Sequence, residues 1–446
     1  MYYTIFHHER EGVFSKTMKK NQKSHQEPNT GGTPPAAAGK SAVVGILCEY
    51  DPFHRGHARQ FALIRDELPG ARIVCLMSGP FTQRGMPALY SPAFRAQAAL
   101  RAGADLVLEL PCLFAVREAE YFALGGIEIL NALGFVTHLS FGCEHMCLPL
   151  LQEAAALLET PDESYEALLR ERLRQGACFA SAQGRALVQA LPARQPACLN
   201  ELKHGKDDLP GILSAPNNVL AVCYIRALRR LGSAIVPLPV LREGRHHEES
   251  LETGGYPSAT AVRNAILGQS WTQAEAAAGY SLPKSPLCPP MSIDRTLLFL
   301  LRRMTRDQLA SLPGCAEGLE NRLFFACRQA VDRAGLLAAL KTKRYSFARL
   351  NRLCCYALLE ITKALQQEVS RPCYVRLLGF RKSGAPLLSL LPQSAIPLVS
   401  KAADGPLNNP AYQADIRAYD AWALGAGEPA GWMFRQPVQV VKAEIP

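Results

Sequence analysis

The stretch that decides the fold runs from residue 41 to residue 57 and reads SAVVGILCEYDPFHRGH. Its first part, Val43–Cys48, is a continuous apolar run, which is typical of a strand buried on both faces of a sheet. A polar loop follows, and the amphipathic segment from His57 to Glu67 predicts a helix. A buried strand that leads through a loop into a helix indicates an α/β protein, in which ligands bind beyond the carboxyl ends of the strands.

The same alternation of apolar runs and helical patterns continues as far as residue 240. Strands that alternate with helices imply right-handed crossovers and a parallel sheet with helices on both faces. The last of these strands contains Pro237 and Pro239, which favour a position at the edge of the sheet. Further strands are expected at 72–77, 105–110, 137–141 and 234–240, and helices at 92–102, 119–133, within 148–190 and at 217–231.

The His-x-Gly-His element at the start of the first helix has the composition of a phosphate site. Gly56 permits close backbone approach, and a helix N-terminus offers unpaired N–H groups with a partial positive charge. His54 and His57 can donate to phosphoryl oxygens as negative charge develops, so the site would act by positioning and electrostatics. Alone, the element also fits a structural pair or a metal site. After the first buried strand of an α/β sheet, it favours adenylyl transfer.

The composition is that of a globular protein with a basic C-terminal third. Of 446 residues, 48% are apolar and 20% are charged, which predicts two or three domains with sizeable cores. No apolar run reaches the roughly 20 residues of a membrane span, so a soluble cytoplasmic protein is expected. The net charge is +10, and residues 291–446 carry 21 Lys and Arg against 12 Asp and Glu, 21 − 12 = +9. That distribution fits nucleic-acid binding and fits solubility alone equally well.

The 14 cysteines are expected to be reduced thiols. Several of them, such as Cys48 and Cys75, lie in apolar segments, where a free cysteine acts as a small hydrophobic residue. Cys143, His145 and Cys147 have the only metal-like spacing, and a structural zinc ion normally needs four ligands. We therefore predict no metal site.

Three regions are expected along the chain. Residues 1–40 end in a Gly-, Pro- and Ala-rich stretch and predict a disordered extension. Residues 41–283 would hold the α/β domain, and the proline-rich segment 282–290 would mark its boundary. Residues 291–446 would form a basic, largely helical domain. Helical periodicity within it occurs at 296–308, 319–334 and 347–364.

Several longer motifs accompany the first one in a fixed order. Residues 44–57 (VGILCEYDPFHRGH) resemble the opening of the bacterial tRNA(Met) cytidine acetate ligases, which belong to the nucleotidyltransferase superfamily with a HIGH-type motif. The resemblance runs from about residue 42 into the C-terminal region, and its ordered motifs are more specific than His-x-Gly-His alone. The other matching segments are 77–88 (MSGPFTQRGMPA), 104–111 (ADLVLELP), 119–123 (AEYFA), 140–144 (SFGCE), 216–218 (PNN), 241–242 (LR) and 258–263 (SATAVR).

The resemblance implies a Rossmann-like nucleotidyltransferase domain at 41–283 and a tRNA-binding domain at 291–446. It implies a ligase that makes acetyl-adenylate and pyrophosphate from ATP and acetate. The acetyl group then passes to N4 of the wobble cytidine of elongator tRNA(Met), giving N4-acetylcytidine. His54 and His57 would be the catalytic pair. ATP contacts are expected at Leu47, Cys48, Glu49, Tyr50, Asp51, Pro52, Phe53, His54, Arg55, Gly56, His57, Ala58, Arg59, Gln60, Gly142, Asn217 and Arg242.

The residue types beyond the first loop suit a nucleotide, and each has a plainer alternative. Arg242 follows a strand and can neutralise phosphate with its planar guanidinium, or form a surface salt bridge. Asn217 can read adenine or ribose, or cap the helix that begins there. Gly142 follows a strand end, where it leaves room for a ligand or serves as a turn residue.

A second phosphate segment is implied at Ser258, Thr260 and Arg263, where hydroxyls and an arginine stand at a helix start. A plain helix cap is the alternative. Arg84, in the loop after the second strand, could face the anionic substrate or tRNA.

The chain departs from the family pattern at two places. Asp51 stands where the family usually has Asn, and residues 243–247 read EGRHH where Gly-Ala-Gly-Tyr-His is usual. The carboxylate of Asp51 would add negative charge near the phosphates and call for a cation. Mg²⁺ normally arrives with a triphosphate, so ATP with Mg²⁺ is expected.

A basic segment at 341–352 (KTKRYSFARLNR) interleaves cations with two aromatic residues. At helical spacing the cations would form a stripe for RNA phosphates, and Tyr345 or Phe347 could stack an unpaired base. A solvated helix face with buried aromatics is the alternative. The expected RNA-binding residues are Lys341, Lys343, Arg344, Arg349 and Arg352.

Two other functions stay open at this stage. A small-molecule adenylyltransferase of the same superfamily would explain the first domain and leave the basic third unexplained. A non-catalytic RNA-binding protein with a nucleotide fold is suggested by Asp51 and the altered segment 243–247. The sequence does not determine the oligomeric state.

Overall fold

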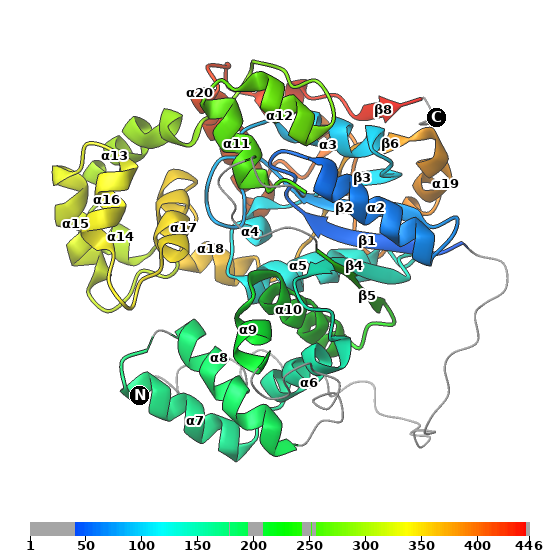
Figure 1. Ribbon diagram of the computed structural model, residues 1–446. Helices are drawn as coiled ribbons and strands as arrows, with labels where there is room; N and C mark the ends of the chain where they lie inside the picture. Colours follow the sequence, from blue (N-terminus) through cyan, green and yellow to red (C-terminus); the bar gives the residue numbers. More distant parts are fainter. Residues whose placement is uncertain (1–40, 178, 195–207, 243–250, 252–255, 443–446) are drawn as a thin grey trace. The chain divides into compact units, whose positions relative to one another are not determined.

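The structure is a computed structural model that describes residues 41–177, 179–194, 208–242, 251 and 256–442. At its centre lies a sheet with the strand order β5-β4-β1-β2-β3-β6-β7, and β8 also pairs with β6 (Figure 1). The strands β1 to β5 run parallel to one another. Their bounds, with those of the remaining strands, are β1 (Val43–Cys48), β2 (Arg72–Ser78), β3 (Leu106–Leu110), β4 (His138–Cys143), β5 (Val236–Leu241), β6 (Val375–Arg381), β7 (Leu398–Val399) and β8 (Gln439–Val441).

The parallel strands lie within two residues of their predicted ends. β1 to β4 are mostly buried runs, whereas β5 is only partly buried. β5, which contains Pro237 and Pro239, is at the edge of the sheet as predicted. The predicted fold class, a Rossmann-like parallel sheet with helices and a helical C-terminal region, is therefore confirmed. The predicted extension at 1–40 lies outside the described residues.

Helices cover both faces of the sheet. Because successive residues of a strand point to opposite faces, the apolar run of β1 supplies two cores. Val44 and Ile46 pack with residues of α2 (Arg55–Glu67) and α3 (Pro92–Arg101) on one face. Val43 belongs to the core on the other face. That core includes residues of α5 (Ala119–Ala132) and α10 (Pro216–Arg230).

The C-terminal region completes the sheet instead of standing apart from it. β6 pairs antiparallel with β3, and β7 and β8 pair with β6. Arg376 of β6 donates to the carboxylate of Glu109 in β3 at 2.6 Å, and both side chains are buried. The sheet thus crosses the boundary predicted at 282–290, because the edge of β3 is covered by a strand from the far end of the chain. Residues from 41 onward form one compact unit.

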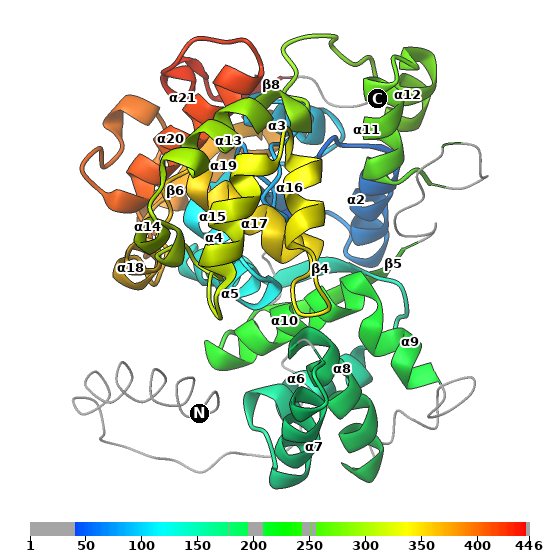
Figure 2. The ribbon, with the colours of Figure 1, turned by 90° about the vertical axis from the view of Figure 1, so that its left-hand side faces the viewer.

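The C-terminal helices end at other residues than predicted, because a predicted helix is divided in two. The predicted helix 296–308 is two helices, because the Thr305 hydroxyl accepts from Gln308 N and begins a new one. The helices α13, α15, α16 and α17 pack together as one group (Figures 1 and 2). The helices of this region are α13 (Asp294–Arg303), α14 (Arg306–Ala310), α15 (Leu319–Gln329), α16 (Arg333–Leu340), α17 (Phe347–Leu358) and α18 (Lys363–Glu368).

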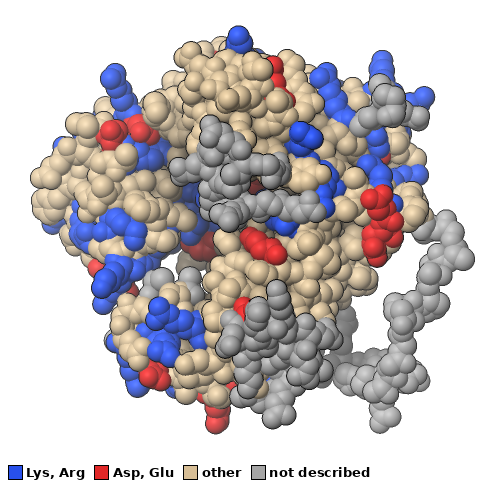
Figure 3. Space-filling view, viewed as in Figure 1, with Lys and Arg blue, Asp and Glu red and all other residues tan. Residues whose placement is uncertain are grey.

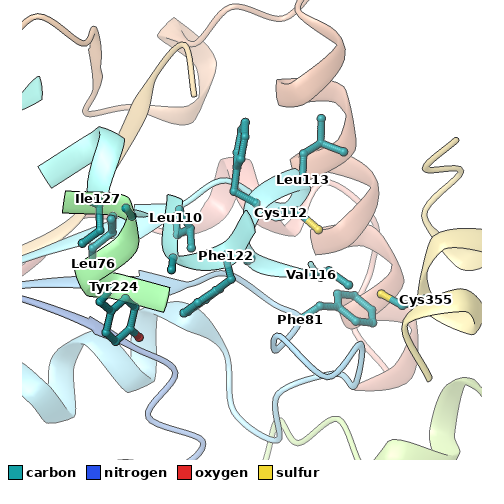
Figure 4. Close-up of a cluster of buried hydrophobic side chains, with 14 of the residues drawn as sticks. Leu76, Phe81, Leu110, Cys112, Leu113, Val116, Phe122, Ile127, Tyr224 and Cys355 are labelled. Atoms are coloured by element: carbon teal, nitrogen blue, oxygen red, sulfur yellow. The ribbon is translucent and has the colours of Figure 1, made fainter. Parts of the chain in front are cut away.

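This helical group shares its core with the sheet. Cys355 of α17 lies beside Val116 and Phe81, which follow β3 and β2 respectively (Figure 4). The hydroxyl of Tyr356 donates to the carbonyl of Val116 at 2.8 Å. The remaining helices are α4 (Cys112–Ala115), α6 (Leu148–Glu159), α7 (Glu163–Arg174), α8 (Phe179–Ala190), α9 (Leu209–Ser214), α11 (Ala259–Leu267), α12 (Trp271–Ala278), α19 (Ala385–Leu388), α20 (Pro410–Gly425) and α21 (Trp432–Arg435). None of the helices in the described residues has the length and apolar character of a membrane span.

Candidate active site

The His-x-Gly-His element forms the N-terminus of α2, where two imidazoles replace the usual capping side chains. Nδ1 of His54, the N-cap residue, accepts from the backbone N of Gly56 at 3.1 Å. Nδ1 of His57 accepts from the backbone N of His54 at 3.3 Å. An imidazole nitrogen that accepts carries no proton, so the neutral ring must hold its proton on Nε2. Both rings therefore present an Nε2–H donor.

The two histidines are held in the neutral state. Burial, together with the nearby cations Arg242 and Arg263, lowers the pKa of His54 to about 3. Burial, the neighbouring His54 ring and Arg242 hold the pKa of His57 well below its ordinary value. Their rings are stacked, with centroids 3.7 Å apart. At neutral pH the pair can donate hydrogen bonds to an anion, and it carries no proton to give away as an acid.

A pocket opens at the carboxyl ends of β1, β4 and β5, with the histidine pair in its wall. This is the place where open α/β sheets bind their ligands. The pocket brings together several residues that the sequence analysis selected from distant segments. Its lining residues that were not predicted as site residues are Leu63, Val240, Leu241, Tyr256 and Pro257. Its lining consists of His54, Gly56, His57, Arg59, Gln60, Leu63, Gly142, Val240, Leu241, Arg242, Tyr256, Pro257 and Ser258.

The first half of the predicted ATP segment lies beneath this pocket. None of the residues 47–53 belongs to the described lining. Tyr50 and Phe53 are buried and meet edge to face, with ring centroids 5.0 Å apart. The centre of the Tyr50 ring also lies 4.8 Å from that of the His57 ring, so Tyr50 packs against the histidine pair. Arg55 and Ala58 lie on α2 outside the described pocket wall as well.

Arg242 and Gly142 are adjacent, as their predicted roles require. A Cβ on Gly142 would come within 2.8 Å of the Arg242 side chain, so the glycine lets this side chain lie across the end of β4. Nη1 of Arg242 donates to the Oδ1 of Asn217 at 3.2 Å. Asn217 is thereby joined to the pocket through Arg242, and it is outside the described lining itself.

Glu144 holds the start of α10, a role that the sequence analysis missed. Its carboxylate accepts from the backbone N of Asn217 and of Asn218 at 3.1 Å, and from Nδ2 of Asn217 at 2.6 Å. A carboxylate at a helix N-terminus is favourable because it meets unpaired N–H groups. The signal was present, since Glu144 ends one family motif and Asn217 lies in another.

The residues of the predicted second phosphate segment make contacts within the protein. Ser258 is the N-cap of α11 and accepts from the backbone N of Ala261 at 3.0 Å. Nη2 of Arg263 donates to the Thr260 hydroxyl at 3.1 Å, and Nη1 donates to Asp51. Of the three predicted residues, Ser258 alone belongs to the described pocket wall. The segment thus meets the first loop through Arg263.

The carboxylate of Asp51 is paired within the protein. This corrects the expectation that it adds an uncompensated negative charge near the phosphates of ATP. Its Oδ1 accepts from the backbone N of Leu89 at 2.7 Å, and its Oδ2 lies 3.4 Å from Arg263 Nη1. The other departure from the family pattern, 243–247, lies outside the described residues. The charge of Asp51 alone therefore does not call for a metal ion.

Arg95 of α3 is a second residue that the sequence analysis missed. Its side chain is fully buried, and its guanidinium donates to the backbone carbonyls of Glu49, Gly79 and Tyr90. It joins the loops that follow β1 and β2. An arginine within the apolar stripe of a predicted helix was the signal, because a buried charge must find partners.

The described pocket wall contains no carboxylate. Mg²⁺ prefers oxygen ligands, and the nearby Glu144 and Asp51 carboxylates already serve backbone N–H groups. These residues do not make a metal-binding set. Cys143 and Cys147 are buried in the core, and the described residues contain no group of three metal-binding side chains.

The predicted RNA segment is a loop followed by a helix, so its cations do not form one helical stripe. Residues 341–346 precede α17, whose N-cap Ser346 accepts from Arg349 N. The side chain of Arg349 donates to the carbonyl of Gly314, and Arg352 lies 3.7 Å from Glu118. Tyr345 is buried and cannot stack a base. The side chains that remain exposed are those of Lys341, Lys343, Arg344 and Phe347.

Arg84 is exposed in the turn after β2. The neighbouring Gly85 has φ +76°, and a Cβ there would lie 2.7 Å from the Cα of Arg352. This turn therefore presses directly against α17.

The fold and pocket define a nucleotidyl transferase of the HIGH class. The sequence profile of the family described as HIGH Nucleotidyl Transferase matches residues 41–431, and the chain belongs to this family. A protein of Acetivibrio thermocellus named tRNA(Met) cytidine acetate ligase is 33% identical over 414 residues, which are 87% of this chain and 96% of the relative. A protein of Syntrophomonas wolfei with the same name is 35% identical over 364 residues, 78% of this chain and 83% of the relative.

A solved structure shows the same fold. The crystal structure of Thermotoga maritima TmcAL bound with alpha-thio ATP has a TM-score of 0.79 and 27% sequence identity to this chain. The match covers 90% of this chain and 100% of that one. These similarities confirm the resemblance that the ordered motifs indicated.

Proposed function

We propose that this chain is an ATP-dependent ligase that acetylates N4 of the wobble cytidine in elongator tRNA(Met). The observation that carries the proposal is the neutral imidazole pair in the pocket wall beside Arg242, with an Nε2–H on each ring. The names of the relatives supply tRNA(Met), cytidine and acetate. The structure of the Thermotoga maritima protein with alpha-thio ATP supports ATP as the nucleotide.

The first step would form acetyl-adenylate. An acetate oxygen attacks the α-phosphorus of ATP, the bond from this phosphorus to the bridging oxygen breaks, and pyrophosphate leaves with the bonding pair. His54 and His57 donate Nε2–H hydrogen bonds to the phosphoryl oxygens, where negative charge grows in the transition state. Arg242 neutralises phosphate charge with a guanidinium that stays protonated, and therefore positively charged, at neutral pH. Mg²⁺ would arrive on the triphosphate and shield its charge.

The second step would move the acetyl group to RNA. The N4 amine of cytidine attacks the acetyl carbonyl, the carbon–oxygen bond to AMP breaks, and the amine loses a proton to solvent. A wobble base already lies in a single-stranded loop, so little unstacking is needed to reach it. We propose that Lys341, Lys343, Arg344 and Phe347 contact the tRNA, and that Arg349 and Arg352 hold their loop in place. The cytoplasm is the expected location.

The decisive experiment is acetyl transfer with labelled acetate. The full chain is incubated with ATP, ¹⁴C-acetate and elongator tRNA(Met), and the nucleosides are separated. Label in N4-acetylcytidine is expected, and it should be absent when the wobble cytidine is replaced by uridine, which has no amine. If the protein exchanges pyrophosphate into ATP in the presence of acetate and the RNA stays unlabelled, tRNA(Met) is ruled out as the acceptor. If pyrophosphate exchange requires another carboxylic acid, acetate is ruled out as the acid that is activated.

A further inference from the structure

A second basic surface occurs on the helical group, apart from the 341–352 segment. Figure 3 shows Lys and Arg side chains gathered where Figure 1 places the helical group, on the face that also carries the loop before α17. Here arginines lie on aromatic rings that face solvent. We call this the arginine–aromatic surface, and it consists of Phe299 and Arg303 of α13, Arg306 of α14, and Phe324, Phe325 and Arg328 of α15.

Two of the three rings of this surface are largely exposed to solvent. Phe299 is 59% exposed and Phe325 is 57% exposed. The guanidinium of Arg303 lies 5.5 Å from the Phe299 ring centre, and that of Arg306 lies 5.4 Å from the centre of Phe325. Large exposed aromatics cost free energy in water, so a cluster of them marks a binding face.

The charges around the rings identify the kind of partner. The helices α13, α14 and α15 together contain six Arg and three Asp or Glu. One of those acids, Asp294, is buried in an ion pair with Arg333 and does not offset the surface. Exposed rings among arginines suit single-stranded nucleic acid, because bases stack on the rings and guanidinium groups contact phosphates.

Not every arginine here is available for a partner. Arg302 donates to the carbonyls of Cys327 and Ala330, and Arg328 donates to those of Phe324 and Arg302. These two join α13 to α15 and keep the surface in shape. Arg303 and Arg306 lie over aromatic rings, and within the described residues neither forms an ion pair with a carboxylate, so we expect them to be able to meet phosphate oxygens.

The helical group is fixed to the carboxyl edge of the sheet. The turn after β2 packs against it, with Gly85 on the backbone of Arg352 and Met86 Sδ at 2.9 Å from Arg333 Nη1. RNA bound on the group would therefore be held at a constant position relative to the pocket edge.

We infer that the arginine–aromatic surface binds unpaired nucleotides of the tRNA, with Phe299 and Phe325 stacking bases and Arg303 and Arg306 contacting phosphates. The inference rests on the proposed function for the identity of the RNA. It adds a contact surface outside the segment 341–352, and it assigns the stacking role that the buried Tyr345 cannot fill.

The test compares three variants of the full chain by fluorescence anisotropy with elongator tRNA(Met). Phe299→Leu/Phe325→Leu keeps apolar volume and removes the rings, Arg303→Ala/Arg306→Ala removes charge, and Arg101→Ala/Arg229→Ala removes two exposed helix arginines elsewhere. The Leu pair should bind about fivefold or more weakly, the lower limit for losing one stacked base. A fourth variant, Phe299→Trp/Phe325→Trp, keeps an aromatic ring at both positions and should bind about as tightly as the wild type.

The salt dependence separates charge from stacking. The plot of log K against log salt should become shallower by about 1.4 to 1.8 in the arginine variant, since each phosphate contact contributes about 0.7 to 0.9. It should be unchanged in the Leu variant and in the control. Equal tRNA affinity and slope in all variants would overturn the inference, whether or not the chain makes N4-acetylcytidine. The inference would also be overturned if the Arg101→Ala/Arg229→Ala control bound tRNA as weakly as the other variants.

The proposed function is judged by different readouts. Acetate-dependent pyrophosphate exchange should be normal in all of these variants, because none of the residues lines the pocket. If the wild-type chain binds tRNA through this surface but transfers no acetyl group to it, the proposed acetylation of tRNA is refuted and the proposed binding surface is supported. If the Phe299/Phe325 and Arg303/Arg306 variants acetylate tRNA with an unchanged KM for tRNA, the proposed binding surface is refuted and the proposed acetylation is supported.

Discussion

Arg263 and Asp51 join two segments of the active site that are far apart in the sequence. The guanidinium of Arg263 donates to the backbone carbonyl of Asp51, and its Nη1 lies 3.4 Å from the Asp51 carboxylate. The other carboxylate oxygen accepts from the backbone N of Leu89 at 2.7 Å. The pair thus ties α11 to the loop before α2. It also explains how an acid is tolerated where the family usually has asparagine.

Removing Arg263 should harm the protein more than neutralising Asp51. Arg263→Ala leaves a buried carboxylate without its cation, and we expect a loss of about 1–2 kcal/mol, discounted because Arg263 is partly exposed. Asp51→Asn keeps an acceptor for Leu89 and should cost less than about 1 kcal/mol. Denaturant unfolding measures both. The double variant should be more stable than Arg263→Ala alone, and additive losses would contradict the pairing.

The neutral histidine pair predicts a particular dependence of stability on pH. Burial lowers the pKa of His54 to about 3 in the folded protein, whereas the unfolded chain has the ordinary value near 6.5. Between these values the unfolded state binds more protons, so stability falls as the pH drops below about 6.5 and continues to fall toward pH 3. Each such group contributes up to about 1.4 kcal/mol per pH unit. Chemical denaturation at several pH values measures the slope.

His54→Asn is the matched variant for this test, because asparagine is itself a good N-cap. The variant should make the unfolding free energy less dependent on pH below about 6.5, by up to the contribution of one histidine. It also removes an Nε2–H donor, and this should lower the rate of acetate-dependent pyrophosphate exchange by about a hundredfold. Between pH 7 and 8 the wild-type rate should show no histidine titration. A rate that follows an ionisation near pH 7 in this range would show that one imidazole acts as a titrating acid or base.

Gly56 should not tolerate a side chain, although its φ is not in the left-handed region. A Cβ there would lie 3.0 Å from the His54 ring, and the ring would have to move to make room. We expect Gly56→Ala to lower kcat/KM for ATP at least about tenfold, because hydrogen-bond donors act only when held in place. Steady-state pyrophosphate exchange measures it. Gly184→Ala on α8 is the control, since nothing lies within 4 Å of its added Cβ.

Glu144 is expected to position Asn217 and, through it, Arg242. Glu144→Ala leaves the first N–H groups of α10 without their acceptor, which should cost about 1–2 kcal/mol of stability. The KM for ATP should rise about five- to tenfold, while kcat changes less, because Arg242 meets the nucleotide in ground and transition states alike. Glu144→Gln keeps one acceptor oxygen and should recover part of the loss. Equal KM values in wild type and Glu144→Ala would rule out this role.

The parallel strands and the motif loop could be predicted because their signals are local. The run Val43–Cys48 is apolar on both faces, and such a pattern has one common explanation. The pocket could be predicted in part for a second reason, since motifs in a known order locate Gly142 and Arg242 without any geometry. Periodicity alone would not have joined residues 54, 142 and 242.

Most of the features that were missed share a physical cause, which is a tertiary partner that overrides the local sequence pattern. β6 contains Arg376, and a charge within a short apolar run argues against a buried strand until Glu109 is placed beside it. Arg95 and Glu144 were missed for the same reason. The start of α17 is different, because Ser346 is a good N-cap and could have been recognised. That signal would have separated Lys341 and Arg344 from the helix.

The pair Glu109–Arg376 predicts that the α/β region does not fold without the C-terminal strands. Arg376 Nε lies 2.6 Å from Glu109, both side chains are buried, and Tyr419 donates to the same carboxylate at 2.9 Å. A chain that ends at residue 290 would leave Glu109 as a buried charge without partners and β3 as an open edge. We expect that fragment to be insoluble or unfolded by circular dichroism, and the full chain to unfold in one transition. Arg376→Ala should destabilise the full chain by about 3–5 kcal/mol, and Arg376→Met with Glu109→Leu by less, because the second change removes the unpaired charge. A soluble, cooperatively folding 41–290 fragment that binds ATP would instead establish the separate domain that the proline-rich segment suggested.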